Sequence, residues 1–392
     1  MKILILYSDS ITDFPSGEKR VAEFESSLLQ KNGHDVKLVK YSNKILKKSP
    51  FKLLLPFVNI WSPLAYFFVK KKISSFNPDL IHFHGINPFL SASAIYSAAI
   101  FKLPIFVTLH SLKAICIEGS YFREGHYCNK CQSKSIFNAL KHQCNRGFLN
   151  SMMFLISLRL LKFIYTNINY VTKFIAVSSF IQEEYIKYGI DPKRIVVKNN
   201  AVNKNLIMGF YKKYNFEDRK SIVYVARMSE AKGLGVIKFL IQNTTYNYEI
   251  IGDGPGYIEL SSFCIRNNYK NVILHGHLNS NETLTIVSKA LCSLIPSICS
   301  EAFGLVAVEC MALGIPIIAS NVGGLGKLIQ QSQSGLTVNE DYNNGFLSAL
   351  NAFFSNPTLL EEFSINGHNY FRTNLTEEIN YLELIKVYNN EK

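Results

Sequence analysis

The stretch that decides the fold is residues 293–319, which read SLIPSICSEAFGLVAVECMALGIPIIA. Its two ends, 293–295 and 315–319, are short apolar runs with the length and composition of buried strands. A polar loop at 296–303 follows the first run, and a helix is predicted from about Gly304. Buried strands separated by a helical segment imply a parallel sheet with a helix on its face. The stretch therefore predicts a strand–helix–strand unit.

The same alternation of apolar runs and helix-length segments continues along the whole chain. Further strand-like runs lie at 3–7, 36–40, 80–84, 105–109, 173–177, 195–197, 222–226, 248–251, 272–275 and 336–338. Twelve strands exceed a usual single open sheet, so we predict an α/β protein with two doubly wound domains and a boundary between residues 200 and 220. Ligands of such domains bind beyond the carboxyl ends of strands, so functional residues are expected just after strands.

The composition is that of a globular protein, because 48% of the 392 residues are hydrophobic and 18% are charged. The apolar run at residues 3–7 leads directly into a polar loop, and a signal peptide would need a longer apolar region. We find no apolar run of the roughly 20 residues that a membrane-spanning helix needs. These observations predict a cytoplasmic protein.

The formal net charge of +13 is concentrated in the first half of the chain. Residues 1–200 hold 27 Lys and Arg against 12 Asp and Glu, whereas residues 201–392 hold 15 against 17. A basic half suits an anionic membrane surface, a lipid phosphate or a nucleic acid. The alternative is an ordinary solvated basic face. A nucleic-acid partner is not expected, because the chain has no recognisable reading module.

Cations and glycines follow the predicted strands of the second half. Arg227 stands at the end of one strand, and Lys232 lies near the start of the next helix. Two cations at a helix N-terminus are typical of a pyrophosphate site, because backbone N–H groups and the helix dipole add to their charge. Gly252, Asp253 and Gly254 follow the next strand, where glycines permit the close approach of a ligand. A surface loop and a plain strand–helix turn are the alternatives.

Two carboxylates lie in the central stretch. Glu301 precedes the predicted helix and Glu309 lies about two turns into it, so the two cannot share one role. Glu309 is flanked by apolar residues and would be costly to bury without hydrogen-bond donors, which ribose hydroxyls could supply. The N–H groups of Phe303, Gly304 and Leu305 could hold a phosphate or sugar oxygen. Alternatively, Glu301 caps the helix and Glu309 is an exposed helix residue.

Together these segments resemble the donor domain of the retaining family 4 glycosyltransferases, whose GT-B fold consists of two Rossmann-like domains facing a central cleft. The resemblance covers nearly the whole chain and is most specific at residues 222–324. In the first half it rests on residues 14–20, 32–36, 78–85, 108–110 and 197–202. It implies an acceptor domain at 1–202 with a cysteine-bearing insertion at 111–147, a donor domain at 203–375, and a C-terminal helix at 376–392 that returns to the first domain.

The resemblance also implies a role for each motif. Arg227 and Lys232 would bind the donor diphosphate and stabilise the leaving group. Glu301, with the N–H groups of residues 303–305, would hold the donor sugar, and Glu309 would hold the ribose. The remaining assignments are His110 at the reaction centre, Gly17, Gly252, Asp253, Gly254, His277, Phe303, Gly304 and Leu305 at the donor site, and His84 and Asn200 on the acceptor side.

The implied reaction transfers a sugar, with retention, from a UDP- or GDP-sugar to a glycan or lipid-diphosphate-linked acceptor in bacterial cell-surface polysaccharide synthesis, such as O-antigen, capsule or exopolysaccharide. No cofactor is implied for catalysis. The alternative enzyme is a non-transferase with the same architecture, such as a sugar-nucleotide epimerase. Two departures leave donor preference and acceptor geometry open: Lys327 stands where the family is commonly acidic, and the loop that contains Gly17 has one glycine fewer.

Four of the eight cysteines, Cys116, Cys128, Cys131 and Cys144, cluster with the spacing C-x11-C-x2-C-x12-C. Four thiolates that include a C-x2-C pair can bind structural zinc. A zinc ribbon usually has two such pairs, so reduced thiols without a metal are the alternative. A disulfide framework is not expected without a secretion signal.

Two apolar segments of the first half lie beside basic residues. Residues 53–69 are preceded by a basic stretch at 44–48 and followed by three lysines at 70–72, and residues 148–165 contain two further cations. This pattern suits a peripheral anchor at the inner face of the plasma membrane. The alternative is that both segments are helices packed within the first domain.

Overall fold

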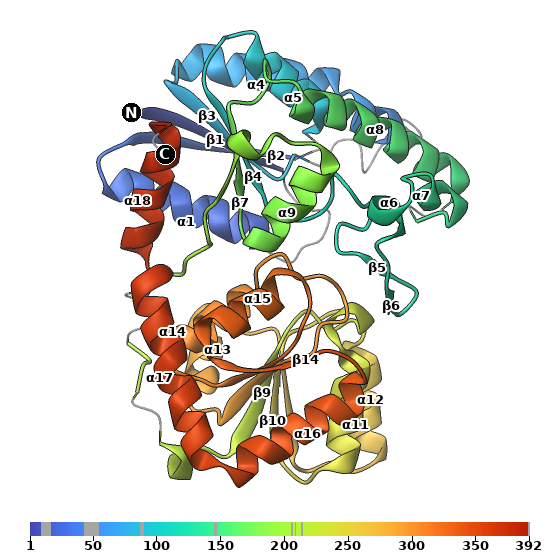
Figure 1. The fold of residues 1–392 in the computed structure, drawn as a ribbon, viewed down its shortest axis with the longest axis vertical. Helices are drawn as coiled ribbons and strands as arrows, with labels where there is room; N and C mark the ends of the chain where they lie inside the picture. The colour runs from blue at the N-terminus through green and yellow to red at the C-terminus, as the bar shows by residue number, and fades with distance from the viewer. Residues whose placement is uncertain are drawn as a thin grey trace. The chain divides into compact units, whose positions relative to one another are not determined.

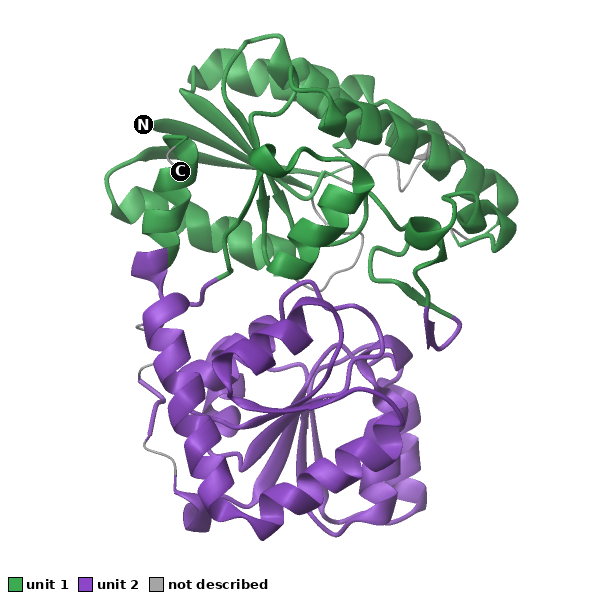
Figure 2. Ribbon diagram, viewed as in Figure 1, with its two compact units in different colours: residues 1–123, 128–200, 380–392 green, residues 124–127, 201–379 purple. Residues whose placement is uncertain are grey.

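The structure, a computed structural model, describes residues 1–8, 17–42, 55–86, 90–144, 147–204, 207, 209–212 and 215–390, with the backbone alone at 55 and 56. The chain forms two compact units (Figure 2). Unit 1 comprises residues 1–123, 128–200 and 380–392, and unit 2 comprises residues 124–127 and 201–379.

Each unit contains a six-stranded sheet in which neighbouring strands run parallel. The strands of unit 1 are β1 (Lys2–Ser8), β2 (Asp35–Tyr41), β3 (Leu80–His84), β4 (Ile105–Leu109), β7 (Lys173–Ala176) and β8 (Ile195–Val197), in the order β2-β1-β3-β4-β7-β8. Those of unit 2 are β9 (Ser221–Val225), β10 (Asn247–Ile251), β11 (Val272–Gly276), β12 (Cys292–Ile295), β13 (Ile317–Ser320) and β14 (Gly335–Val338), in the order β11-β10-β9-β12-β13-β14. The prediction of twelve parallel strands in two doubly wound domains is confirmed.

The helices of unit 1 cover both faces of its sheet. They are α1 (Gly17–Lys31), α3 (Leu55–Ile60), α4 (Pro63–Phe76), α5 (Ser91–Ala99), α6 (Lys130–Ser133), α7 (Asn138–Lys141), α8 (Phe148–Thr166), α9 (Ser179–Tyr188) and most of α18 (Glu377–Tyr388). Helices α4, α5 and α8 lie side by side over one face, and α1 covers the other (Figure 1). Opposite faces are expected, because β1 connects to β2 in one direction across the sheet and the later strands follow in the other.

The described part of the apolar segment, residues 55–69, belongs to two helices, α3 and α4. Helix α3 ends at Ile60, and the Ser62 side chain accepts a hydrogen bond from the Ala65 N–H as the N-cap of α4, with Pro63 at the first helical position. The basic stretch at 44–48 lies outside the described residues.

Helix α8 corrects the expectation that no apolar segment is long enough to cross a membrane. Among the described residues it is the one helix that is long and apolar enough to cross a membrane, with 19 residues and a mean hydropathy of 1.4. Half of that stretch is buried, and α8 packs against α3, α5 and α7. Length and composition alone do not distinguish such a helix from a core helix.

The helices of unit 2 are α11 (Leu234–Asn243), α12 (Tyr257–Arg266), α13 (Ser280–Val287), α14 (Leu305–Ala312), α15 (Gly323–Ser332), α16 (Tyr342–Ser355) and α17 (Pro357–Asn374). Helices α11, α12 and α16 lie on one face of the sheet, and α13, α14 and α15 lie on the other (Figure 1). Short 3-10 turns occupy η2 (Pro192–Arg194), η3 (Phe216–Asp218) and η4 (Glu230–Lys232).

One feature was not foreseen from the sequence. A small hairpin, β5 (Phe122–Arg123) with β6 (His126–Tyr127), interrupts the cysteine-bearing segment. The C-terminal helix was expected to return to the first domain, and Leu384, Val387 and Tyr388 of α18 pack in the core of unit 1 with residues of β1, β3 and β4.

Candidate active site

In unit 2 the order of strands reverses between β9 and β12, and this switch point is where open α/β sheets bind ligands. The loops after neighbouring strands are joined there by backbone hydrogen bonds. Ile298 N–H donates to the Ala231 carbonyl at 2.9 Å, and Met228 N–H donates to the Asp253 carbonyl at 2.9 Å. The loops after β9, β10 and β12 therefore form one connected edge.

Two glycines permit this close packing. Gly233 has a φ of +79° and Gly252 has a φ of +131°, and residues that carry a side chain rarely adopt such positive values. A Cβ on Gly233 would collide with the carbonyl oxygen of Pro296, and one on Gly252 would collide with that of Ala226. Packing of the backbone therefore requires glycine at position 252. This agrees with the alternative that the segment is a plain strand–helix turn.

Lys232 and Glu301 meet at this edge. The Lys232 Nζ forms an ion pair with Glu301 Oε1, and the Ser297 hydroxyl donates to the same oxygen at 2.6 Å. The Tyr224 hydroxyl donates to the backbone carbonyl of Lys232 at 3.1 Å and fixes the turn. The Lys232 side chain is 31% exposed and that of Glu301 is 17% exposed, so a ligand can reach both.

The charges of this pair stabilise each other. Burial alone would lower the pKa of Lys232, but the Glu301 carboxylate outweighs it and the pKa is raised. Burial alone would raise the pKa of Glu301, but the charge of Lys232 and hydrogen bonds from Lys232 and Ser297 lower it. Both side chains are charged at neutral pH.

Helix α14 begins next to this pair. Its N-cap is Gly304 at a φ of +102°, so Glu301 does not occupy the capping position. The first N–H groups of the helix, from Leu305 onward, have no partner within the helix. Glu309 lies only slightly more than one turn from Leu305, which corrects the predicted two turns. Phe303 is buried and anchors the loop.

The turn between β13 and α15 holds the backbone of Glu301. Gly324 N–H donates to the Glu301 carbonyl at 2.7 Å. Gly323 has a φ of +57°, and a Cβ there would collide with the same carbonyl oxygen. Lys327, the departure from the family pattern, lies in the second turn of α15.

The other predicted donor residues also follow strands of this sheet. Arg227 is exposed directly after β9, with its Cγ 3.2 Å from the position of a Cβ on Gly254. Asp253 Oδ1 accepts a hydrogen bond from Gly254 N–H at 2.6 Å. His277 is exposed directly after β11.

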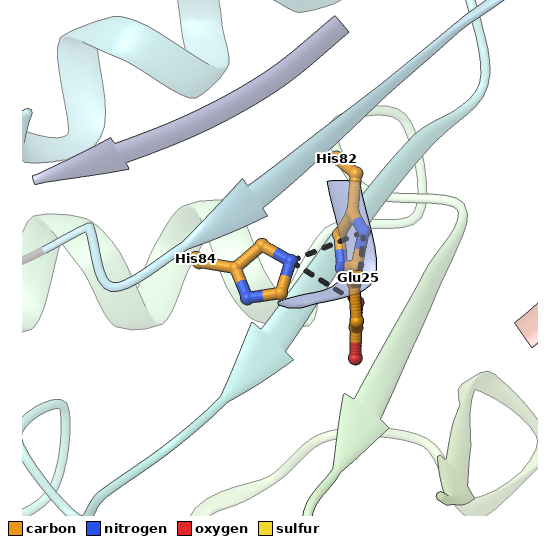
Figure 3. A group of neighbouring side chains, drawn as sticks. All are labelled: Glu25, His82 and His84. Carbon is orange, nitrogen blue, oxygen red and sulfur yellow. Dashed lines mark hydrogen bonds and ion pairs between the residues drawn. The ribbon is translucent and has the colours of Figure 1, made fainter. Parts of the chain in front are cut away.

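In unit 1 the strand order reverses between β1 and β3, and a cluster of polar side chains is buried behind this point. Figure 3 shows Glu25 from α1 facing His82 and His84 from β3. The Lys198 Nζ donates to Glu25 Oε1 at 2.7 Å, and the nitrogens His84 Nδ1 and His110 Nε2 lie 2.9 Å apart. His84 is fully buried, so it reaches a surface pocket only through His110.

That pocket lies within unit 1 and brings ionisable groups together. It is lined by Glu18, Gly85, Ile86, Thr108, Leu109, His110, Ser111, Lys113, Ala114, Leu161, Tyr165 and Tyr185. Lys113 Nζ lies 3.5 Å from Glu18 Oε1. Burial is the main cause that holds the pKa of His110 well below its usual value. His110 is therefore neutral at physiological pH.

Gly17 and Asn200 are the other residues of unit 1 that the resemblance assigned to the site. Gly17 is the first residue of α1, and the loop before it lies outside the described residues. Asn200 is buried, with no hydrogen-bond partner for its Oδ1 among the described residues.

Sequence reasoning missed Glu25 and Lys198, although one signal was present. The buried positions of α1 include Val21, Ala22, Glu25, Leu28 and Leu29, so the carboxylate falls on the apolar stripe of the helix. A charged residue on such a stripe needs a buried partner. Which residue supplies that partner could not be read from the helix itself.

The four cysteines of the segment at 111–147 are half-buried free thiols. The pKa of Cys131 is raised to about 12 by burial and then by the negative charges of Cys116, Cys144 and Cys128. The four thiols therefore lie near one another. Among the described residues, however, the ligand atoms that stand within 4.8 Å of one another are those of Glu25, His82 and His84.

Comparison with known proteins identifies the class. Residues 17–206 match the family model of Glycosyltransferase Family 4, and residues 210–370 match that of Glycosyl transferases group 1. Together the two matches span most of the chain. The fold and the two matches define a glycosyltransferase of the GT-B class. This protein is a glycosyltransferase whose first half is of the family 4 type and whose second half is of the group 1 type.

Individual relatives agree with this identification. The chain is 26% identical over 359 residues to an uncharacterized glycosyltransferase of Methanocaldococcus jannaschii, covering 90% of this chain and 86% of the relative. It is 27% identical over 152 residues to the D-rhamnosyltransferase WbpZ of Pseudomonas aeruginosa, covering 38% of this chain and 40% of that enzyme. Its fold is similar to that of HepE from Anabaena, with a TM-score of 0.70, 16% identity and full coverage of both chains. It is also similar to sucrose-phosphate synthase from Thermosynechococcus elongatus, with a TM-score of 0.73, 18% identity and coverage of 100% and 99%.

Proposed function

We propose that this glycosyltransferase moves a sugar, with retention of configuration, from a nucleotide-sugar donor to a glycan or lipid-diphosphate-linked acceptor in cell-surface polysaccharide synthesis. The observation that carries the proposal is the Lys232–Glu301 pair, which lies at the switch point of the unit 2 sheet beside the N-terminus of α14. An anionic diphosphate suits the cation and the helix N-terminus, and sugar hydroxyls suit the carboxylate.

The proposed roles follow from position. Lys232 and Arg227 bind the diphosphate, and Lys232 stabilises the negative charge that builds on the leaving group. Glu301 accepts hydrogen bonds from the donor sugar while the first N–H groups of α14 hold its oxygens. Glu309 accepts hydrogen bonds from the ribose. His110, neutral at the pocket of unit 1, contacts the sugar during transfer.

The donor is best sought first among UDP-sugars. HepE has been solved with UDP and with UDP-glucose, and it shares the fold of this chain. The acceptor class is suggested by WaaB, a galactosyltransferase of the lipopolysaccharide outer core whose fold is similar. These relatives guide the choice of ligands to test.

A thermal-shift screen of UDP- and GDP-sugars tests the donor assignment. A donor at 100 times its Kd stabilises the folded state by about 2.7 kcal/mol, which for a unit of this size raises Tm by roughly 5–10 °C. The free sugar is the control and should give no shift, because it lacks the diphosphate. If no nucleotide or nucleotide sugar raises Tm, the proposed donor site is wrong. NMR of the product anomer then tests retention.

We also propose that the four clustered cysteines bind one structural zinc ion. Short elements of two to four residues make up the segment that holds them, so it has little apolar core of its own. Purified protein should contain about one zinc per chain. Cys131→Ser should lose the metal, whereas Cys264→Ser, outside the cluster, should retain it. A zinc content near zero in protein purified without chelators would contradict the proposal.

We propose a peripheral position at the inner face of the plasma membrane, with unit 1 facing an anionic lipid surface. Exposed apolar side chains on α4, such as Leu64 and Phe67, lie beside the lysines at 70–72. Flotation with vesicles that contain anionic lipid should recover the protein at low salt and less of it at high salt. Phe67→Ser should weaken recovery, and Ile258→Ser, at an even more exposed position in unit 2, should not. Salt-insensitive or absent binding would contradict this placement.

A further inference from the structure

The buried cluster of unit 1 joins five elements of the sequence. Its carboxylate comes from α1, two imidazoles come from β3, a hydroxyl comes from β4, an ammonium follows β8, and a phenol comes from α18. The members with no exposed surface or almost none are Glu25, His82, His84, Lys198, Thr108 and Tyr388. None of these groups is needed to build a parallel sheet, and burying so many polar groups is costly unless they satisfy one another.

The central pair sets the charge of the cluster. The Lys198 Nζ donates to Glu25 Oε1 at 2.7 Å. Burial by itself would raise the pKa of Glu25, but the charge of Lys198 and the neighbouring His84 hold it well below its usual value. One buried negative charge is therefore balanced by one buried positive charge, and a further charge on the histidines would be uncompensated.

The second carboxylate oxygen faces the histidines. Glu25 Oε2 lies 3.4 Å from His84 Nε2 and 3.9 Å from His82 Nδ1. Dashed lines in Figure 3 join the three side chains. Three such atoms could in principle surround a metal ion. A divalent ion would leave a net charge of about +2 in the interior, because Lys198 already neutralises Glu25. A proton on His84 Nε2 fits this space without adding charge.

The positions of the protons in the cluster then follow from Glu25, which is ionised because its pKa lies well below its usual value. Glu25 Oε2 is buried without a hydrogen bond of regular geometry among the described residues, and His84 Nε2 lies 3.4 Å from it. A carboxylate only accepts hydrogen bonds, so we assign the proton of His84 to Nε2, where it faces Glu25. With its proton assigned to Nε2, His84 offers Nδ1 as an acceptor, and His110 Nε2, 2.9 Å away, donates to it. The pKa of His110 lies well below its usual value, so its remaining nitrogen, Nδ1, is also bare.

His82 contacts the same proton position, because its Nδ1 lies 3.3 Å from His84 Nε2, and it also belongs to a second chain of contacts. The Tyr388 hydroxyl lies 2.7 Å from His82 Nδ1, and Thr108 Oγ1 lies 2.7 Å from His82 Nε2. The ring of His82 therefore has a partner at each nitrogen besides its contact with His84. Its packing keeps His84 aligned, since the two ring centroids are 4.2 Å apart.

We infer that Glu25 and His84 are positioning residues that hold His110 as the neutral Nε2–H tautomer and so present its bare Nδ1 as a hydrogen-bond acceptor at the pocket. The ligand chemistry that this selects is a hydroxyl that donates, such as a sugar hydroxyl. The inference rests on the proposed function only in placing the substrate next to His110. The order of protons stands on the geometry of unit 1.

Glu25→Gln is the decisive variant, because Lys198 dictates how the amide must turn. The amide carbonyl faces the ammonium, so the NH2 group faces His84 Nε2 and forces it to accept. His84 Nδ1 then carries the proton and donates to His110 Nε2, which moves the proton of His110 to Nδ1. Nitrogen NMR of 15N-histidine protein distinguishes the tautomers, with the His110 signals assigned by their loss in His110→Ala.

The expected result is an Nε2–H tautomer at His110 in the wild type and an Nδ1–H tautomer in Glu25→Gln. We also expect kcat to fall about 10-fold or more while the donor KM stays within about 2-fold. Glu184→Gln is the matched control, since Glu184 is also a buried glutamate of unit 1, bonded to Tyr121 and Lys187, and it should change neither readout. If Glu25→Gln does not fold, Glu25→Leu with Lys198→Met removes both charges together and should give a mixture of tautomers.

The same tautomer in the wild type and in the folded Glu25 variants would overturn the inference. So would one equivalent of bound metal that is lost in Glu25→Gln and kept in Cys131→Ser, because it would place an ion where the proton is assigned. If His110→Ala leaves kcat unchanged, the role of His110 in the proposed function is wrong, whereas the NMR result still decides the proton order.

Discussion

Replacing Lys232 by Met removes the cation of the candidate donor site and retains most of the apolar stem. Glu301, only 17% exposed, is left with the Ser297 hydroxyl as its remaining side-chain donor. Loss of one partner of a largely buried ion pair costs about 1–2 kcal/mol once partial solvent access is allowed for. We therefore expect Tm to fall by roughly 3–6 °C.

The catalytic effect should be larger than the effect on stability. A preorganised group that stabilises transition-state charge contributes about 100- to 1,000-fold to turnover. Lys232→Met should reduce kcat/KM by that factor, because the diphosphate leaving group loses one of its two proposed cations and keeps only Arg227. Donor binding, measured by titration calorimetry, should weaken as well, since the cation also contacts the ground-state diphosphate.

The acid dependence of stability gives an independent measure of the pair. The pKa of Glu301 is lower folded than unfolded, so the unfolded chain binds more protons as the pH falls through the carboxyl range. The pair therefore stabilises the protein above the unfolded pKa, and this contribution is lost as the pH falls through the folded pKa. Without Lys232, burial raises the Glu301 pKa, and this part of the acid destabilisation should disappear.

The matched control is Lys238→Met. Lys238 pairs with Glu259 in the same unit, but that glutamate is 66% exposed. Such a pair contributes about 0–1 kcal/mol, and it lies away from the switch point, so activity should be unchanged. Equal losses of activity in the two variants, or none in Lys232→Met, would refute the assignment of Lys232 to the donor site.

Three further predictions test other parts of the structure. Gly252→Ala should lower the free energy of unfolding by about 3 kcal/mol in chemical denaturation, because of its φ of +131° and a backbone collision, whereas Gly235→Ala, with open space in α11, should be neutral or raise it by up to about 1 kcal/mol. Arg227→Ala should lower kcat and Glu309→Ala should weaken donor binding about 10-fold or more in calorimetry; unchanged values for both would refute their placement. Tyr388→Phe removes the hydroxyl 2.7 Å from a buried histidine and should cost about 1 kcal/mol of stability, and a loss near zero would show that the contact does not stabilise the fold.

Much of the fold could be predicted, because the signal for a buried strand is local. Runs such as 105–109 are apolar throughout, and the structure buries every residue of β4. The position of β12 before the loop that holds Glu301 could be predicted for the same reason. The hairpin β5–β6 could not, since two-residue strands have no periodicity to detect.

The candidate site was predicted in composition but not in its contacts. Glycines and charges after strands indicated which loops would matter, because carboxyl ends of parallel strands share one edge. The sequence assigned Lys232 to a phosphate and Glu301 to a sugar, and it did not indicate that the two would form an ion pair. Nor did it indicate that glycine is required at position 252 by the backbone of Ala226, the residue after β9.

The sequence by itself determined which segments become strands and helices, and therefore the two parallel sheets, because hydrophobic periodicity records the burial of each residue locally. Only the tertiary structure decided which polar groups meet inside. Glu25 and Lys198 lie 173 residues apart, and Tyr388 lies 306 residues from His82. Their contacts depend on the order of strands in the sheet and on the packing of the last helix, and neither is encoded within any one segment.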